Sequence, residues 1–189
     1  LFGEAEDILY VKGSGCDLAT IDEDGFTPLL LKTLRKLAAL ENISDVEMIR
    51  QQQMAKSNPD APNPSVEALL HAIIPFNWID HTHADAVVTL TNTPEGNELI
   101  RKIYGERLLL IPYVMPGFKL SRKVFEMTTK IDWTQCEGMI LLNHGIFSFG
   151  DTARESYTRM IDLVSLAEDF LAKNSTLANT AATESVPGK

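Results

Sequence analysis

The sequence predicts one α/β domain in which helices cover a sheet. Helical and strand patterns alternate along the chain, with no internal repeat and no second block of different composition. A length of 189 residues allows one domain with a substantial core, and an apolar fraction of 44% is ordinary for a globular protein. One α/β domain is the simplest account of this alternation.

Helices in the first half of the chain are predicted from their start signals. Thr27-Pro28 predicts the first, because threonine is a good N-cap and proline suits the first helical position. Ser44 is expected to cap the second. Three prolines make residues 57–64 a loop, and a third helix is expected to begin near Asn63 or Pro64.

Short apolar runs that stop at glycine or polar residues predict the strands. These are residues 8–11, the segment through His81 and His83, and residues 108–111, 139–142 and 146–149. The run 108–111 is apolar at every position, so we expect it to be buried on both faces.

Further helices are expected between and after these strands. Asp85 is predicted to cap one, Thr93-Pro94 to start another that ends at a glycine, and residues 121–130 to form a third. Asp151 or Thr152 is predicted to cap the last helix, whose apolar residues recur at the spacing of an amphipathic helix.

The charge and composition exclude several classes of partner. A net charge of −9 argues against nucleic acid or an anionic membrane, because both need clustered Lys and Arg. It still allows a phosphorylated small substrate, which needs only a local anion site. The two cysteines form no metal or disulfide pattern, so a cytoplasmic location is expected. No apolar stretch reaches the roughly 18 residues that span a bilayer.

The two ends of the chain suggest how it is organised. The first residues have neither the basic start nor the apolar core of a signal peptide. They also lack an initiator Met, so we expect the chain to begin partway through a longer protein. Residues 1–172 are expected to form the domain. The polar tail 173–189 is expected to be disordered or to act as an interdomain linker.

Two histidines, His81 and His83, are the first candidates for chemistry. Side chains at positions i and i+2 of a strand project from the same face, so both imidazoles can reach one point. His144, in the tight connection Asn143-His144-Gly145, could supply a third imidazole and leave one metal position open, as in catalytic zinc sites. The alternative is that the His-x-His spacing is chance and that His144 only serves the turn.

Glu67 is the second candidate, near the start of a predicted helix. With either Asn63 or Ser65 as the cap, the acid of a capping box would fall at another position. Glu67 is therefore either a catalytic carboxylate or a solvated acid that the helix dipole favours, and the sequence weighs the two evenly. His71, one turn further along, is expected to pack rather than to bind a ligand.

The turn Lys12-Gly13-Ser14-Gly15 follows the first predicted strand. Backbone N–H groups in such a turn can face an anion. Taken alone, the segment is better explained as a plain tight turn, because the residues of a P-loop are missing.

Five motifs follow one another along the chain: Lys12-Gly13-Ser14-Gly15, Pro64-Ser65-Val66-Glu67, His81-Thr82-His83-Ala84-Asp85, Pro112-Tyr113-Val114-Met115-Pro116-Gly117 and Asn143-His144-Gly145. In order and approximate spacing they resemble the class II aldolase/adducin family over residues 8–172. The resemblance is closest to the aldolase part of bifunctional rhamnulose-1-phosphate aldolase/short-chain dehydrogenases. In such proteins a dehydrogenase domain follows, and the tail 173–189 would suit the linker to it. No dehydrogenase glycine motif is present in this chain.

The resemblance implies a fold and an activity. The fold is a three-layer α/β/α arrangement with a central, mainly antiparallel sheet. The activity is a metal-dependent retro-aldol cleavage of a ketose 1-phosphate, of the rhamnulose 1-phosphate type, to dihydroxyacetone phosphate and an aldehyde. The metal is Zn²⁺ or another divalent cation.

The resemblance also implies a role for each candidate residue. His81, His83 and His144 would hold the metal, and Glu67 would move protons. Tyr113 would reach the active site of a neighbouring subunit in a cyclic homotetramer, where it can protonate the oxygen of the aldehyde. The substrate phosphate would be bound by Ser14, Gly15 and Ser65.

Other members of the same family supply the alternatives. Sugar-phosphate 4-epimerases and related dehydratases use the same three histidines. An adducin-like binding module without catalysis belongs to a different class of function, and proteins of that kind tend to lose the metal histidines. All three are present here.

Overall fold

The computed structural model describes the backbone of residues 5–184 and the side chains of residues 5–174. The chain divides into two compact units. Unit 1 comprises Leu1–Pro75 and Val114–Ile131, and unit 2 comprises Phe76–Tyr113 and Asp132–Lys189. Each unit has a hydrophobic core of its own.

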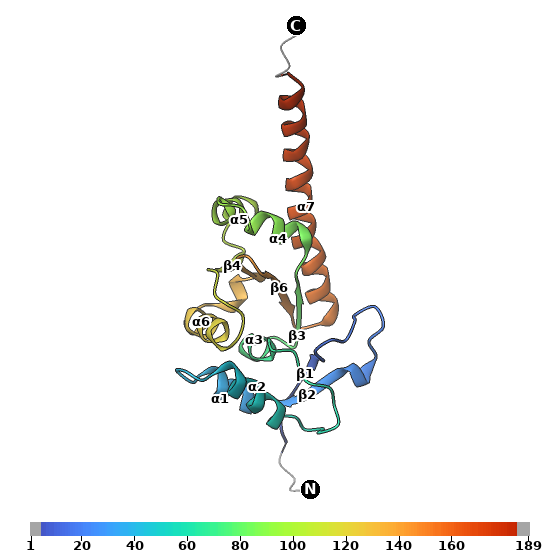
Figure 1. Cartoon of the computed structure of the whole chain (residues 1–189), viewed down its shortest axis with the longest axis vertical. Coiled ribbons are helices and arrows are strands. Elements are labelled where there is room, and N and C mark those ends of the chain that lie inside the picture. The colour runs from blue at the N-terminus through green and yellow to red at the C-terminus, as the bar shows by residue number, and fades with distance from the viewer. Residues whose placement is uncertain (1–4, 185–189) are drawn as a thin grey trace. The chain divides into compact units, whose positions relative to one another are not determined.

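Unit 1 combines helices with a two-stranded antiparallel sheet, within the described residues. The strands, drawn in blue in Figure 1, are β1 (Ile8–Lys12) and β2 (Phe26–Leu30), and the short 3-10 helix η1 (Glu23–Gly25) lies in the connection between them. The helices are α1 (Leu31–Ala38), α2 (Asp45–Met54), α3 (Ala68–Ile73) and α6 (Phe118–Thr128). Their buried apolar side chains form the core of the unit, among them Leu29, Leu34, Met48, Leu69 and Phe118.

Unit 2 is built on a four-stranded sheet in the described part of the chain, with the order β3-β6-β5-β4. Its strands are β3 (Trp78–Thr82), β4 (Leu108–Ile111), β5 (Gly138–Leu141) and β6 (Gly145–Gly150). β6 pairs antiparallel with β3 and with β5, and β5 pairs parallel with β4. The prediction of an α/β fold with a central, mainly antiparallel sheet is therefore confirmed.

Helices flank this sheet. They are α4 (Asp85–Thr91), α5 (Gly96–Tyr104) and α7 (Ala153–Glu184), and the 3-10 helix η2 (Trp133–Gln135) precedes β5. The two central strands β5 and β6 are buried at every position, because their sequences are almost continuously apolar. The core of unit 2 is formed by Val87, Leu90, Ile140, Ile146 and Leu163, with further apolar residues around them.

Several predicted helix limits agree with the structure. Ser44 caps α2, and its hydroxyl accepts a hydrogen bond from the Glu47 amide at 3.2 Å. α5 ends at Gly105, which has a φ of +60°. Thr152 caps α7 by accepting a hydrogen bond from the Glu155 amide at 3.2 Å.

The prediction of a helix starting at Thr27-Pro28 is wrong. Both residues lie in β2, where Pro28 pairs with Tyr10, and α1 begins only at Leu31. Proline is tolerated there because an edge position needs no N–H donor on that side. The Thr27 hydroxyl donates to the Pro62 carbonyl at 2.9 Å, which further fixes the strand.

Other helix starts also differ from the predictions: α3 begins later than predicted, and α4 begins one residue earlier. α3 begins at Ala68, because the preceding residues bond with the first strand instead: the Ser65 amide donates to the Lys12 carbonyl at 3.1 Å. In α4 the N-cap is Ala84, without a side-chain capping bond, and Asp85 is the first helical residue.

The last helix extends further than the sequence predicts. α7 continues to Glu184, through most of the segment for which a disordered tail or linker was expected. That segment has no glycine or proline before Pro187, so nothing in it interrupts the helical hydrogen bonds. Residues 185–189 of the expected tail lie outside the described residues.

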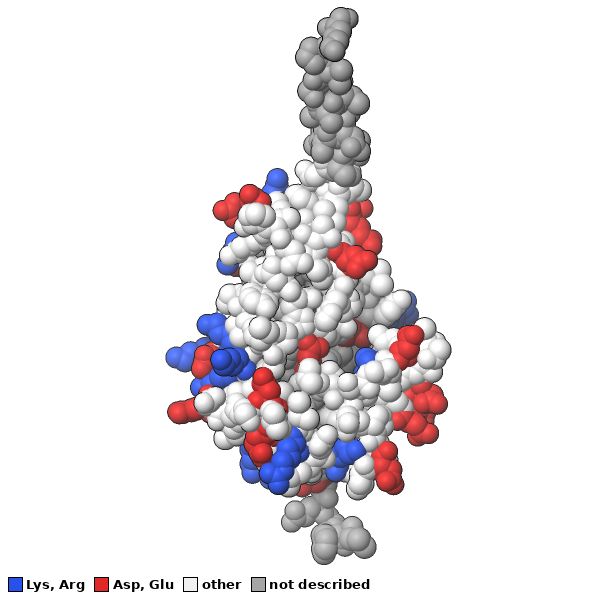
Figure 2. All heavy atoms as spheres, in the orientation of Figure 1, with Lys and Arg blue, Asp and Glu red and all other residues white. Residues whose placement is uncertain are grey.

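The surface carries both signs of charge. On the face shown in Figure 2, basic side chains stand beside acidic ones and form no continuous basic surface. Among the described residues, no helix combines the length and the apolar character that a membrane span requires.

Candidate functional site

Three histidines of unit 2 lie close together. His81 is on β3, His83 follows the last residue of that strand, and His144 lies in the turn between β5 and β6. Their ligand nitrogens are all within 4.8 Å of one another, and the Nε2 atoms of His81 and His83 are 3.1 Å apart. A tetrahedral zinc site with Zn–N bonds of about 2.0–2.1 Å needs nitrogens about 3.3 Å apart. The predicted trio therefore fits a shared divalent cation.

The imidazole of His81 is held in one orientation. Its Nδ1 lies 2.9 Å from the Ile146 carbonyl oxygen, which can only accept, so Nδ1 carries the proton and the Nε2 lone pair faces the other histidines. The ring also stacks on Phe147, its cross-strand partner, with centroids 4.1 Å apart. Bonds of this kind fix the tautomer and the direction of a metal ligand.

Gly145 gives the histidines the room they need. A Cβ added at this position would lie 2.5 Å from the Thr82 carbonyl oxygen, 2.9 Å from the His83 ring and 3.0 Å from the His81 ring. The glycine of the Asn143-His144-Gly145 motif is therefore required by the close approach of β6 to the end of β3.

A buried hydrogen-bond network lies next to His81 in the chain and was not found from the sequence. The Ser156 hydroxyl donates to the Asp80 carboxylate at 2.6 Å, and the Ser148 hydroxyl donates to the Ser156 carbonyl at 2.8 Å. Both serines are fully buried, and Asp80 pairs with Ser148 across the strands. Strand alternation could have signalled Asp80, because it places this acid on the face opposite His81.

Unit 1 brings together the two segments predicted to bind phosphate. The Ser14 amide donates to the Asn63 carbonyl at 2.7 Å, and an isolated bridge joins Gly13 to Pro64. Ser14 and Gly15 therefore lie beside the segment that contains Ser65, and Gly15 has a φ of +82°. The backbone amides of Ser14 and Ser65 both donate to backbone carbonyls and are therefore not available to an anion. The groups of these residues that could bind an anion are their side-chain hydroxyls.

The two predicted catalytic residues, Glu67 and Tyr113, lie next to the start of α3 and just after the end of β4. Glu67 is the half-buried N-cap residue of α3 in unit 1, and its side chain makes no capping hydrogen bond, as its position outside any capping box led us to expect. Its amide donates to the Ser65 hydroxyl at 3.3 Å. Tyr113 follows β4 at the end of a segment of unit 2, and it is 54% exposed.

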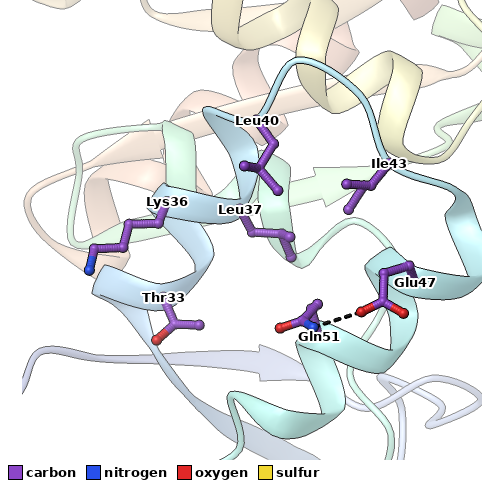
Figure 3. A pocket seen from close by; sticks show the side chains of 7 residues that line it. All are labelled: Thr33, Lys36, Leu37, Leu40, Ile43, Glu47 and Gln51. Atoms are coloured by element: carbon purple, nitrogen blue, oxygen red, sulfur yellow. Dashed lines mark hydrogen bonds between the residues drawn. The ribbon is translucent and has the colours of Figure 1, made fainter.

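A separate pocket in unit 1 contains none of these candidates. It lies between α1 and α2, has a volume of about 370 Å³, and has Leu37, Leu40 and Ile43 along its apolar side (Figure 3). At its edge Gln51 donates to the Glu47 carboxylate at 2.7 Å. The pocket holds no group of histidine or cysteine ligands.

The chain is similar to proteins of known family. The model of the "Class II Aldolase and Adducin N-terminal domain" matches residues 3–171. A Bacillus subtilis (strain 168) protein named "Uncharacterized oxidoreductase YuxG" is 33% identical over 169 residues, which are 89% of this chain and 24% of that protein. The chain therefore spans about a quarter of the length of this curated relative.

Solved structures show the same likeness. The N-terminal class II aldolase domain of a conserved protein from Thermoplasma acidophilum is 38% identical, with a TM-score of 0.79 over 87% of this chain and 75% of that chain. An aldolase II superfamily protein from Pseudomonas syringae is 14% identical, with a TM-score of 0.63 over 92% of this chain and 64% of that chain. The second likeness is one of fold alone.

Proposed function

The chain belongs to the class II aldolase and adducin family, and on that premise we propose that it forms the aldolase domain of a metal-dependent lyase. The substrate is a ketose 1-phosphate of the rhamnulose 1-phosphate type, and the products are dihydroxyacetone phosphate and an aldehyde. The observation that supports this proposal most directly is the 3.1 Å separation of the His81 and His83 Nε2 atoms, with His144 beside them. Three converging imidazoles that leave one metal position open are typical of a catalytic metal site.

The proposed metal ligands are His81, His83 and His144. Neutral imidazoles suit zinc, and cobalt or manganese would also be accepted by nitrogen ligands. Bound there, the cation supplies a Lewis acid for the negative charge that develops as the C3–C4 bond breaks. The Ile146 carbonyl keeps the His81 ring in the tautomer that this role requires.

The remaining roles concern protons and phosphate. When the C3–C4 bond breaks, its electron pair stays on C3 as an enediolate, and the C4 hydroxyl loses its proton as the aldehyde forms. Glu67 is proposed to donate a proton to C3, and Tyr113 of a neighbouring subunit to take the proton of the C4 hydroxyl in cleavage and to return it to the aldehyde oxygen in the reverse reaction. The hydroxyls of Ser14 and Ser65, with the Gly15 backbone, are proposed to bind the phosphate.

One assay tests the reaction. The full-length protein, loaded with Zn²⁺, is incubated with L-rhamnulose 1-phosphate, and dihydroxyacetone phosphate is measured. We expect product that disappears when the metal is chelated. Formation of the C4 epimer without dihydroxyacetone phosphate would replace the aldolase by the epimerase, and no turnover of the sugar phosphate would reject both.

A second assay tests the ligands. Metal content is measured for His81→Ala, His83→Ala and His144→Ala, with His71→Ala as the matched control on α3. We expect the first three to lose the metal and the control to keep it. Unchanged stoichiometry in all three would reject the metal centre.

Any dehydrogenase activity is proposed to belong to a further domain, outside the residues of this chain. The oxidoreductase in the name of the Bacillus subtilis relative describes a protein of which this chain covers 24%. The chain has no dehydrogenase glycine motif. We therefore propose a dehydrogenase domain beyond its C-terminal end.

A further inference from the structure

A side-chain hydrogen bond joins two segments that each carry a candidate metal ligand. The Asn143 Nδ2 donates to the Asn92 Oδ1 at 2.7 Å. Asn143 directly precedes His144 in the turn between β5 and β6. Asn92 is the C-cap of α4, the helix that begins directly after His83 and Ala84. The bond therefore closes a loop that runs from His83 through α4 and back to His144, all within unit 2.

The backbone conformation of Asn143 indicates that its side-chain amide is needed for a contact and not for the turn itself. Asn143 has a φ of +59°, in the left-handed region that favours glycine. Glycine would form the same turn at lower conformational cost, although asparagine tolerates this region better than most residues. The turn alone does not require an amide, whereas the bond to Asn92 does.

The bond between Asn143 and Asn92 connects the turn to a different element than the backbone hydrogen bonds of the turn do. The His144 amide donates to the Leu141 carbonyl at 3.1 Å, and the Leu142 amide donates to the Ile111 carbonyl at 3.0 Å, so these bonds run to β5 and β4. The bond to Asn92 runs to α4 instead. The end of α4 is itself fixed, because the Asn92 amide donates to the Val88 carbonyl at 3.0 Å.

We propose that Asn92 and Asn143 are positioning residues that hold the His144 imidazole at a metal-binding distance from His83. The inference rests on the metal centre of the proposed function but not on the reaction catalysed there. Both side chains are exposed. Water can therefore replace the bond when it is broken, and the fold should survive its loss.

The affinity for Zn²⁺ tests this role. Dissociation constants are measured by competition with a chelator on the full chain, for the wild type, Asn92→Ala, Asn143→Gly and the double variant. Asn143→Gly keeps the left-handed turn and removes only the amide. We expect each single change to weaken zinc binding about tenfold, as loss of an outer partner of a metal ligand does. The double variant should be no weaker than either single one, because both remove the same bond.

Two aspartate variants separate the hydrogen bond from charge. Asn92→Asp keeps an oxygen that can accept from Asn143, so zinc affinity should match or exceed that of the wild type. The double variant Asn92→Asp/Asn143→Asp leaves only acceptors at this contact and should weaken zinc binding, although it adds negative charge. Asn97→Ala is the matched control, since it removes an exposed amide that accepts from Arg101 at 3.2 Å on α5. It should bind zinc as the wild type does.

Two further readouts distinguish positioning from general stability. The visible spectrum of the Co²⁺-loaded protein should change in Asn92→Ala and Asn143→Gly, and the unfolding temperature of the metal-free protein should not. Wild-type affinity and spectrum in both variants would overturn the inference, and so would additive losses in the double variant Asn92→Ala/Asn143→Gly. If the wild type binds zinc at the histidines but forms no dihydroxyacetone phosphate, the aldolase fails and these positioning roles stand. If the wild type does not bind zinc there, both the metal centre and the inference are rejected.

Discussion

At the scale of single residues, close approach of backbone to side chains shapes the histidine cluster. Gly145 is surrounded by the Thr82 carbonyl oxygen and by the rings of two histidines, so its missing Cβ is what allows the three imidazoles to converge. The position tolerates no side chain, independent of any chemistry. The effect of a methyl group there can be tested directly.

Gly145→Ala should lower both stability and metal affinity. A Cβ placed 2.5 Å from the Thr82 oxygen forces the backbone apart, and overpacking of this kind costs about 1–3 kcal/mol in the free energy of unfolding. Urea denaturation and zinc competition measure the two losses. Gly105→Ala is the control for metal affinity: alanine at a φ of +60° strains the backbone although no heavy atom lies within 4 Å of the added Cβ, so stability should fall while zinc affinity is kept. A Gly145→Ala protein with wild-type metal affinity would show that the turn can move without disturbing the histidines.

Glu67→Gln separates proton transfer from metal binding. Volume and polarity hardly change, so the fold and the metal should be kept. If Glu67 transfers a proton, kcat should fall by ~10²–10⁴ with little change in KM. If it is only an acid at the start of α3, the change should cost a few tenths of a kcal/mol and leave turnover intact. A near-normal kcat measured under saturating substrate would reject the proposed mechanism, even with the metal in place.

The Cys136 thiol should react slowly. Burial raises the pKa of this thiol, and the nearby Asp132 carboxylate raises it further. A raised pKa means that less thiolate is present at a given pH, so alkylation by iodoacetamide at about pH 8 should be slower than for free cysteine. The rate is measured in a Cys16→Ser background, and Asp132→Asn should partly restore it. Alkylation as fast as that of free cysteine would contradict this expectation.

At the scale of elements, α7 is attached to the sheet by polar as well as apolar contacts. Ser156 on α7 donates to Asp80 on β3, and its carbonyl accepts from Ser148 on β6. One helix turn thus joins two neighbouring strands, and one of these strands carries His81. Apolar packing sets how close α7 lies, whereas these bonds set where along the strands it lies.

Ser156→Ala should destabilise the protein by about 1–3 kcal/mol, because it leaves a half-buried carboxylate without its donor. Thr158→Ala, at an exposed position two residues along the same helix, should change the free energy of unfolding by less than about 0.5 kcal/mol. Urea denaturation of both variants provides the comparison. Equal stabilities would mean that water replaces the Ser156 hydroxyl.

Elements with local signals were predictable from the sequence. Ser44 and Gly105 mark helix ends through contacts within a few residues, and both predictions are confirmed. Thr27-Pro28 misled because the pairing of Pro28 with Tyr10, a contact between distant residues, overrides the local preference for a helix start.

The same distinction applies to the candidate site. The i, i+2 spacing made the convergence of His81 and His83 predictable, although β3 ends before His83. The Asp80–Ser156 bond spans 76 positions and the Asn92–Asn143 bond spans 51, so neither has a local pattern. Contacts of this range become visible only when the strand order is known.

At the scale of the whole molecule, the proposed assembly is a cyclic homotetramer. The reason for this proposal is Tyr113. The resemblance to the family implies that this tyrosine reaches the active site of a neighbouring subunit, and it is 54% exposed in this chain. Sedimentation of the full-length protein at micromolar concentration should show a species larger than the monomer. Tyr113→Phe should keep the assembly while slowing turnover, because it removes only the hydroxyl. A monomer with full activity would contradict the proposed position of the tyrosine.

The three histidines all belong to unit 2, on segments that pack around one core. A ligand that binds only the folded state adds its binding free energy to folding, about 2.7 kcal/mol at a hundredfold excess over the dissociation constant. A cation at this centre would therefore stabilise the folded state of the unit 2 segments that carry the histidines, which are otherwise held by backbone pairing and the core of that unit. The supply of the metal would then influence how often the sheet opens and how long the protein survives proteolysis, quite apart from any sugar that it cleaves.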